Sequence, residues 1–438
     1  MSTSQLSGWG RTFVPGKELR SEDLPAITKG AALSRGLGRS YGDASLPAQG
    51  GTVVGTTLAD RILAFDEATG LLRVEAGVCL GDLNRLLLPR GFFTPVTPGT
   101  TYVTLGGMVA SDVHGKNHHV AGTFGKHVRS LLIRTGTGQV VKCSREQERE
   151  LFLATLGGMG LTGHILEIEV AFPKIPSPWI YEETETAPNF DVFLEKLNKA
   201  SQNFPMTVSW IDTISSGASM GRGIVFAGRW AEPNEAKEGL PKPRAAIPMI
   251  PLPSFALNRF TMGVFNTALY TVSPKRQQHI VSPEKFFYPL DRIHAWNRMY
   301  GKSGVTQHQC VIPKDKANAG VRKLFDTLRV HGACSFLTVL KDCGPEGDGL
   351  LSFPKPGISV ALDIPIRSNT QLVIDKLNEI VIENEGRIYL TKDGFTRPDH
   401  FRAMDPRVDT FLEVVRKWDP EGTLRSAQSE RVFGSSRS

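Results

Sequence analysis

Two glycine-rich stretches hold the residues best suited to chemistry in this sequence. The first, "RGLGRSYGDA" at residues 35–44, places Gly36, Gly38 and Gly42 where a bent loop would turn its backbone amides toward one anion. Two arginines in the same stretch add positive charge. The pattern predicts either a cradle for a pyrophosphate or an ordinary tight turn after a strand. It is neither a dinucleotide-binding fingerprint nor a Walker loop, because the G-x-G-x-x-G register and the Walker lysine are absent.

The second stretch, "PGTTYVTLGGMVASDVHGKNHH" at residues 98–119, combines glycines with threonine and serine hydroxyls and three histidines. The histidines suggest a metal site, but His118 and His119 are adjacent and therefore point to different sides of most backbones. No cysteine or carboxylate lies at helical ligand spacing, so we predict no metal. A packed polar loop is the other alternative. Two such stretches in one unit are better explained by a single long, phosphate-bearing cofactor between them.

The elements that must position these stretches alternate between residues 31 and 172. Runs such as "ILAFDEATGLLRVEAG" read as strands that reverse at turns of the D-E-A-T-G and R-T-G-T-G type. A helix is predicted over residues 79–91, closed by Gly91, and another over residues 144–158 with Ser144 as its N-cap. The pattern is typical of a mixed α+β unit.

The sequence pattern changes at residue 179. Long helical patterns, such as "KANAGVRKLFDTLRVHG" and "NTQLVIDKLNEIVIENEG", are separated by strands such as "GISVALDIPI". This predicts an antiparallel sheet with helices on one side. Residues 240–283 combine prolines, apolar side chains and flanking Lys and Arg, which fits an irregular loop on this domain, a mobile lid, or a segment that touches a membrane.

Composition limits the class of protein. With 438 residues the chain is too long for one ordinary core, so we expect two domains. The formal charge of +7 is spread along the chain without dense basic blocks, which argues against nucleic-acid binding. Five widely spaced cysteines without a C-x-x-C pair indicate reduced thiols. The first residues contain no apolar run typical of a secretion signal, and no uninterrupted apolar run reaches the length of a bilayer span, so we expect neither feature.

Several motifs together resemble one family. They are "RGLGRSYGDA", "PGTTYVTLGGMVASDVHGKNHH", "FGKHVRS", "LFLATLGGMGLTG", "WNRMYG", "LSFPKPG", "RIYLTKD" and "MDPRVD". The sequence is similar to the decaprenylphosphoryl-ribose 2-oxidases, flavoproteins of the vanillyl-alcohol-oxidase and para-cresol-methylhydroxylase superfamily. The resemblance implies an α+β fold of two domains: an FAD-binding domain that begins with residues 1–174, a substrate-binding domain at 175–386, and a segment at 387–438 that returns to the FAD-binding domain.

The resemblance also implies which residues contact FAD. They are Arg35, Gly36, Leu37, Gly38, Arg39, Ser40, Tyr41, Gly42, Asp43 and Ala44 in the first stretch, Gly99, Thr104, Leu105, Gly106, Gly107, Ser111, Asp112, Val113 and His114 in the second, and Ile165 and Tyr389 elsewhere. Members that bind flavin covalently often carry a histidine in the first stretch. Arg39 stands at the matching place, so the FAD is expected to be non-covalent.

The resemblance assigns catalysis to His114, Tyr389 and Lys392. Oxidation of a secondary alcohol needs a base for the hydroxyl proton and a flavin that accepts the hydride. Lys392 is the candidate for that base, or for the group that orients the hydroxyl, and a surface ion pair with Asp393 is the alternative. The substrate pocket is expected to include Tyr41, Lys116, Gln307, Gln309, Lys341, Ser359, Ala361 and Lys392. Either Lys116 or Lys341 would meet a lipid phosphate, and Gln307 and Gln309 would share one face of a strand.

Two positions depart from the family. Ala361 stands where mycobacterial members carry a cysteine beside the flavin, and Ser359 replaces an asparagine. The implied activity is oxidation of a polyprenyl-phosphoryl-ribose at its 2-hydroxyl, and an NADH-dependent short-chain reductase would then complete an epimerisation to the arabinose donor for the cell wall. The alternatives are an alditol or aldonolactone oxidase of a free sugar and a non-catalytic anion- or lipid-binding protein. The expected location is the cytoplasm or the inner membrane surface, and a periplasmic location stays open.

Overall fold

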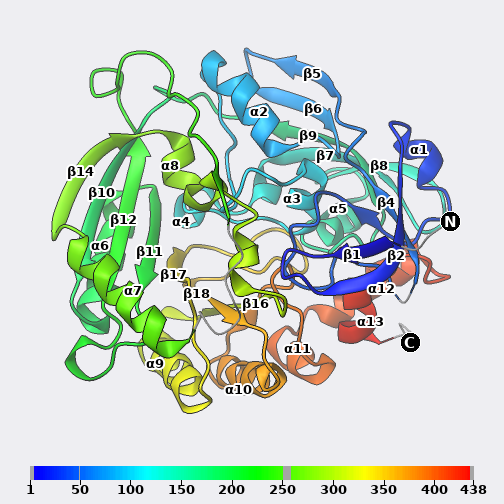
Figure 1. Ribbon diagram of the computed structural model, residues 1–438. Helices are drawn as coiled ribbons and strands as arrows, with labels where there is room; N and C mark the ends of the chain where they lie inside the picture. The colour runs from blue at the N-terminus through cyan, green and yellow to red at the C-terminus, as the bar shows by residue number, and fades with distance from the viewer. Residues whose placement is uncertain (1–3, 49, 250–257, 435–438) are drawn as a thin grey trace.

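The computed structural model describes residues 4–48, 50–249 and 258–434. Part of the segment expected to form an irregular loop or lid, residues 250–257, therefore lies outside the described residues. The chain builds a large antiparallel sheet on one side and two smaller sheets on the other (Figure 1). This mixture of helices and largely antiparallel sheets confirms the predicted α+β class.

The first small sheet is assembled from the N-terminal strands. Its order is β1-β2-β4-β3, with β1 (Ser4–Ser7), β2 (Phe13–Arg20), β3 (Ser34–Arg35) and β4 (Thr52–Gly55). Strand β4 runs parallel to β2 and β3, whereas β1 is antiparallel to β2. Since the first glycine-rich stretch leaves β3 directly, this sheet fixes where that stretch begins.

The second small sheet is antiparallel throughout, in the order β5-β6-β9-β7-β8. Its strands are β5 (Ile62–Asp66), β6 (Leu71–Glu75), β7 (Val128–Arg134), β8 (Val140–Ser144) and β9 (His164–Ala171). The D-E-A-T-G turn joins β5 to β6 as predicted, and Gly70 closes it with a φ of 71° that only glycine adopts without strain. Alternate residues of β7 and β9, among them Leu131 and Ile168, enter the core of this region.

Short helices belong to this region: α1 (Leu24–Ile27), α2 (Leu80–Leu87), α3 (Leu105–Ala110) and α5 (Arg149–Thr155). Helix α4 (His118–Ala121) lies against β17 of the large sheet. Helix α2 continues into a 3₁₀ turn and ends, as predicted, at Gly91, whose φ is 78°. The predicted cap of the next helix is wrong. Ser144 is the last residue of β8, its hydroxyl accepts the amides of Glu146 and Gln147, and α5 begins only at Arg149.

The large sheet has the order β14-β10-β12-β11-β17-β18-β16-β19, and every neighbouring pair is antiparallel. The strands are β10 (Ile180–Ala187), β11 (Met206–Ile211), β12 (Gly223–Trp230), β14 (Arg276–Val281), β16 (Val305–Ile312), β17 (Thr338–Cys343), β18 (Gly357–Pro365) and β19 (Arg387–Ile388). Strands β13 (Ile247–Pro248) and β15 (Ile293–His294) form a separate parallel pair.

Three long helices, α6 (Phe190–Asn203), α9 (Lys314–Val330) and α10 (Thr370–Glu383), pack on one face of this sheet. Cys310, Val360 and Leu340, from three adjacent strands, join Leu324 and Leu377 of the helices in one core. Because side chains alternate along a strand, residues one position away point to the opposite face. That opposite face carries the polar residues of the candidate site. Two further helices, α7 (Arg259–Val272) and α8 (Pro283–Phe287), lie in the connection that contains β13 and β14.

The C-terminal helices α11 (Pro398–Met404), α12 (Val408–Trp418) and α13 (Ala427–Phe433) return toward the start of the chain (Figure 1). The amide of Arg425 donates to the carbonyl of Ala32, and the amide of Ala427 donates to the carbonyl of Leu46. The first and last parts of the described chain therefore pack together. Among the described residues, no helix combines the length and apolar character needed to cross a bilayer.

Candidate active site

The first glycine-rich stretch is held between two distant parts of the chain. The amide of Trp9 donates to the carbonyl of Ser40 (2.7 Å), and the amide of Tyr41 donates to the carbonyl of Thr391 (3.0 Å). Gly42 lies so close to the backbone of Asp393 that a β-carbon at this position would overlap its carbonyl oxygen. A residue with a side chain is therefore excluded at Gly42, and the stretch is fixed directly against the loop that carries Lys392.

Backbone amides of this stretch are available to a ligand. Within the described residues, the amides from Leu37 to Ser40 donate to no protein acceptor, and neither do those from Gly42 to Ala44. Gly38 takes a φ of 62°, which turns successive N–H groups in the way that an anion-binding nest requires. The stretch thus fits the pyrophosphate of a dinucleotide cofactor.

Part of the second stretch is helical, and sequence analysis predicted no helix there. Residues Leu105–Ala110 form α3, and the Thr104 hydroxyl caps it by accepting the amide of Gly107 (3.2 Å). The two stretches touch, because a β-carbon at Gly36 would overlap the Thr104 hydroxyl. Leu105, Val113 and Ile165 have buried side chains in the core of the first region.

Asp112 has a structural position inside the second stretch. Its carboxylate accepts the amide of Gly125 (2.8 Å) and the hydroxyl of Ser352, and its side chain is fully buried. Burial, opposed by these hydrogen bonds, raises the pKa of Asp112 to about 6. The carboxylate ties the stretch to the chain near residue 352, so its contacts are with the protein.

His114 lies at the centre of the site. It is buried against the rings of Tyr389 (5.0 Å between centroids) and Phe353 (5.2 Å). Its Nε2 is 2.9 Å from the side-chain amide nitrogen of Gln309, which also lies 3.2 Å from the hydroxyl of Ser359. With Gln309 as donor, His114 carries its proton on Nδ1, and this buried atom has no partner among the described residues. A free, buried donor of this kind indicates a ligand-facing position.

Tyr389 joins the two regions. Its hydroxyl donates to the carbonyl of Ser111 (2.9 Å), and its amide donates to the carbonyl of Gln309 (2.9 Å). The ring also packs on Phe353, which sequence reasoning did not single out. Tyr389 therefore links the second stretch to strand β16.

Lys392 follows in the turn after β19. Its ammonium lies 4.2 Å from the centre of the Tyr41 ring, so it faces the first stretch. The alternative of a surface ion pair with Asp393 is wrong, because the Asp393 carboxylate pairs with Arg431 (2.9 Å). Arg431 of α13 also binds Asp43 (2.7 Å), so one guanidinium fastens the first stretch to the Lys392 loop.

Gln307 and Gln309 share one face of β16, as predicted, and Gln307 reveals a residue that sequence reasoning missed. Gln307 donates to the carboxylate of Asp363, which also accepts the hydroxyl of Tyr300 (3.2 Å). Asp363 is fully buried, and burial raises its pKa to about 6. Its place two residues after Ala361 on β18 was the available signal, because both residues must point to the same face.

The positive charge of the site is concentrated around Lys341, which pairs with Ser359 across β17 and β18. Burial, followed by the charges of Asp363 and Lys341, sets the pKa of Lys392 at about 8. Burial and then the Lys341 charge lower the pKa of His114 well below its usual value and that of His118 to about 4. Both histidines are therefore neutral near pH 7, and the desolvated lysines Lys341 and Lys392 carry the positive charge that favours an anionic ligand.

Lys116 stands apart from the other site lysines. Its ammonium donates to the carbonyl of Phe286 and lies 4.7 Å from the centre of that ring. Burial is the main cause that lowers its pKa to about 7, and Lys341 contributes. The adjacent histidines diverge as predicted: His118 accepts the amide of Gly344, whereas His119 contacts the carbonyl of Phe204. In the described parts of the chain, no group of three potential metal ligands lies together.

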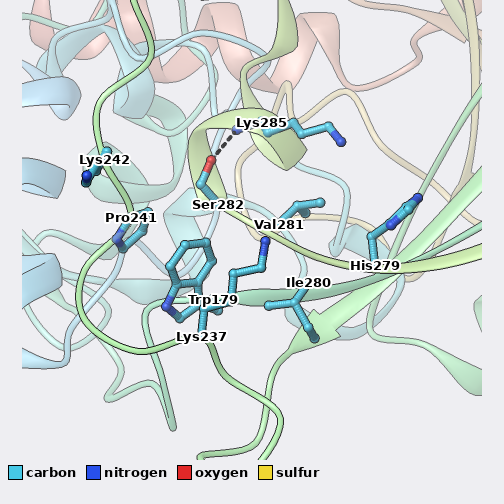
Figure 2. A pocket seen from close by; sticks show the side chains of 9 residues that line it. All are labelled: Trp179, Lys237, Pro241, Lys242, His279, Ile280, Val281, Ser282 and Lys285. Carbon is cyan, nitrogen blue, oxygen red and sulfur yellow. Dashed lines mark hydrogen bonds between the residues drawn. The ribbon is translucent and has the colours of Figure 1, made fainter.

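A separate recess opens on the surface, away from these residues. It has a volume of about 310 Å³ and lies where the end of β14 meets the start of β10. Figure 2 shows its lining, which includes Trp179 and the lysines Lys237, Lys242 and Lys285. None of the predicted site residues lines this recess, so it is not part of the candidate active site.

Comparison with known proteins agrees with this geometry. Residues 26–144 match the FAD binding domain family, which confirms the expected cofactor. Decaprenylphosphoryl-beta-D-ribose oxidase of Mycolicibacterium smegmatis is 34% identical over 98% of this chain and 98% of its own length. An uncharacterised protein of Streptomyces coelicolor is 30% identical over 81% of this chain and 100% of its own length, whereas bovine L-gulonolactone oxidase is 25% identical over 44% of this chain and 46% of its own length.

The near full-length match to the Mycolicibacterium oxidase shows the family, and together with the FAD-binding domain it shows that the reaction is an oxidation. The chain is an FAD-dependent oxidoreductase, and it belongs to the family of the decaprenylphosphoryl-β-D-ribose oxidases.

Proposed function

We propose that this protein oxidises the 2-hydroxyl of a polyprenyl-phosphoryl-β-D-ribose to the 2-keto sugar. The observation that carries the proposal is the grouping of two desolvated lysines, Lys341 of β17 and Lys392, beside the neutral His114 and His118. A neutral sugar gains little from such a site, whereas a phosphoryl group relieves the repulsion among its cations. The Mycolicibacterium relative is an oxidase named for the same substrate class, which supports the proposal.

FAD supplies the acceptor for the hydride when it is bound. The free amides of the first stretch would hold its pyrophosphate, and the capped α3 would lie beside it. We propose that the binding is non-covalent. The Arg39 guanidinium lies 4.6 Å from the ring centre of Trp9 and 5.5 Å from that of Tyr102, so no nucleophilic side chain occupies this position.

Lys392 is proposed to take the hydroxyl proton. A pKa of about 8 leaves roughly a tenth of the lysine neutral at pH 7, so an unprotonated amine is accessible under ordinary conditions. The nearby Asp363 carboxylate stabilises the ammonium that forms when the proton arrives. The Tyr41 ring stabilises the protonated amine through a cation–π contact.

The neighbouring polar groups are proposed to orient the sugar. His114 presents its free Nδ1–H, and its position is fixed by Gln309 and the Tyr389 ring. Lys341 would meet the phosphate, because its charge lowers the pKa of each of the neighbouring titratable groups His114, Lys116, His118 and Lys392. Ala361 pairs with Gln309 across β16 and β18, and its small side chain leaves room beside that amide.

A lipid-linked keto sugar needs a further enzyme and access to a membrane. We propose that an NADH-dependent short-chain reductase converts the product to the arabinose donor, and that the protein associates peripherally with a membrane surface. The first proposal rests on the family resemblance, and the second rests on the lipid chain of the proposed substrate.

Anaerobic flavin reduction tests the proposal. Addition of a short-chain polyprenyl-phosphoryl-ribose should bleach the flavin band near ~450 nm, whereas free ribose and xylitol should leave it unchanged. Bleaching by the free sugars alone would instead indicate an alditol oxidase. Precipitation of the protein with acid should release the flavin into the supernatant, and a flavin that stays with the pellet would contradict non-covalent binding.

A further inference from the structure

Helix α7 presents an apolar stripe to solvent. Phe260, Val264 and Val272 lie on its outer side and are 79%, 58% and 79% exposed, and Ala268 continues the four-residue spacing between them. In Figure 1, α7 lies along the outside of the molecule at the large sheet. Large side chains this exposed on a single helix face are unusual for a surface in contact only with water.

The inner side of α7 packs beside the candidate site. Met262 belongs to one buried cluster with Tyr41, Trp296 and Tyr300. Tyr41 in turn lies under the ammonium of Lys392. The exposed stripe is therefore separated from the proposed catalytic lysine by only a few packed side chains.

A further exposed apolar residue, Val330, continues the stripe beyond the helix. The guanidinium of Arg259, at the start of α7, donates to the carbonyl of Arg329 at the end of α9 (3.1 Å). The next residue, Val330, is exposed as well. The apolar surface thus extends from α7 onto the end of α9.

The segment of sequence that contains α7 carries charge of one sign. From Gly239 to Pro283 the sequence contains five Lys and Arg residues and no Asp or Glu. Of the cations next to α7, Arg259 begins the helix, Lys275 is exposed just after it, and Arg276 pairs with Glu183 of β10 (2.9 Å). An apolar helix face bordered by cations is the pattern of a helix that lies in the interface of an anionic bilayer.

We propose that the outer face of α7, with Val330, docks this protein on an anionic lipid bilayer. Phe260, Val264 and Val272 would enter the boundary between headgroups and acyl chains, and Lys275 would meet anionic headgroups. The inference deepens the proposed function and rests on it for its purpose: docking here would bring the catalytic site to the membrane that holds a polyprenyl substrate.

Vesicle flotation tests the docking. The wild-type holoenzyme should float with vesicles of phosphatidylcholine and phosphatidylglycerol, and more weakly with phosphatidylcholine alone. The double variant Phe260→Ser/Val264→Ser should bind about tenfold to a hundredfold more weakly, because each apolar side chain withdrawn from lipid costs roughly a factor of ten. Lys275→Gln should weaken binding only to the anionic vesicles, and added salt should mimic it.

A matched control separates docking from general surface hydrophobicity. Leu86 is 41% exposed on α2, in the other region, and Leu86→Ser should float like the wild type. Flotation of the double variant at the wild-type level would overturn the proposal. So would light scattering that shows a wild-type dimer, no vesicle binding, and a monomeric double variant, because the stripe would then be an interface between two copies.

A water-soluble, short-chain substrate distinguishes this proposal from the function itself. The double variant should reduce its flavin with that substrate at the wild-type rate, and it should be slower only with a long-chain substrate embedded in vesicles. If the wild type floats but does not oxidise the soluble substrate, the proposed function fails and the docking stands.

Discussion

The charge neighbours of Lys392 make a prediction with a definite sign. Asp363 raises the pKa of this lysine, and Lys341 lowers it, around a value of about 8 that burial largely sets. The substitution Asp363→Asn removes the attractive charge while an amide can still accept the hydroxyl of Tyr300. The pKa of Lys392 should therefore fall in this variant, whereas Lys341→Met should raise it.

The magnitude follows from the titration. Removal of one nearby charge shifts a pKa by about one unit. At pH 7 the neutral fraction of Lys392 would then rise from about a tenth to about a half in the Asp363→Asn variant, a gain of roughly fivefold. In the Lys341→Met variant it would fall to about one in a hundred.

The assay is the pH dependence of kcat/KM, which reports groups of the free enzyme. The position of the inflection is compared rather than the height of the curve, because Lys341 is also proposed to meet the phosphate. Lys392→Met should abolish the inflection and reduce the rate by roughly 10²- to 10⁴-fold. Inflections that stay in place in both charge variants, or that move in the same direction, would refute Lys392 as the titrating base.

Three further outcomes are expected. Gly42→Ala should prevent flavin retention and lower the melting temperature, because its β-carbon would overlap a backbone oxygen, whereas Gly99→Ala meets open space and should melt like the wild type. Because the folded-state pKa of Asp112 is raised to about 6, the wild type should lose stability as pH rises from about 4 through 6. Asp112→Asn should remove about 3 kcal/mol of this loss. Equal pH slopes of the unfolding free energy in the wild type and the variant, measured by chemical denaturation, would contradict that sign. Tyr389→Phe, which loses the hydrogen bond to Ser111, should lower the unfolding free energy by about 1 kcal/mol and keep the flavin, and a loss of flavin would assign the hydroxyl a direct role.

Local patterns predicted the helix that ends at Gly91 and the common face of Gln307 and Gln309, because turn chemistry and strand alternation are determined by neighbouring residues. They failed at Ser144, where side-chain hydrogen bonds to nearby amides form a turn in place of a helix cap. They also failed in the second glycine-rich stretch, where Thr104 caps a short helix despite two following glycines. A hydroxyl side chain can accept backbone amides either in a turn or as a helix cap. Ser144 forms the turn and Thr104 forms the cap, and residue type alone did not distinguish these two outcomes.

Long-range contacts were beyond local reasoning. Asp363 becomes visible only when β16 and β18 pair, and Arg431 only when α13 returns to the first stretch. Phe353 enters the site from a loop without periodic pattern. The lowered pKa of Lys392 likewise depends on burial by segments that are distant in sequence. Chemistry that depends on such packing requires the folded chain.

A deuterium isotope effect tests the central claim most directly. The reaction proposed here breaks the C–H bond at C2 of the ribose when the hydride leaves. Anaerobic flavin reduction by a polyprenyl-phosphoryl-ribose deuterated at C2 should be several-fold slower than reduction by the unlabelled substrate, whereas deuterium at C3 should leave the rate unchanged. Equal rates for all three substrates, or slowing by the C3 label alone, would contradict oxidation at the 2-hydroxyl.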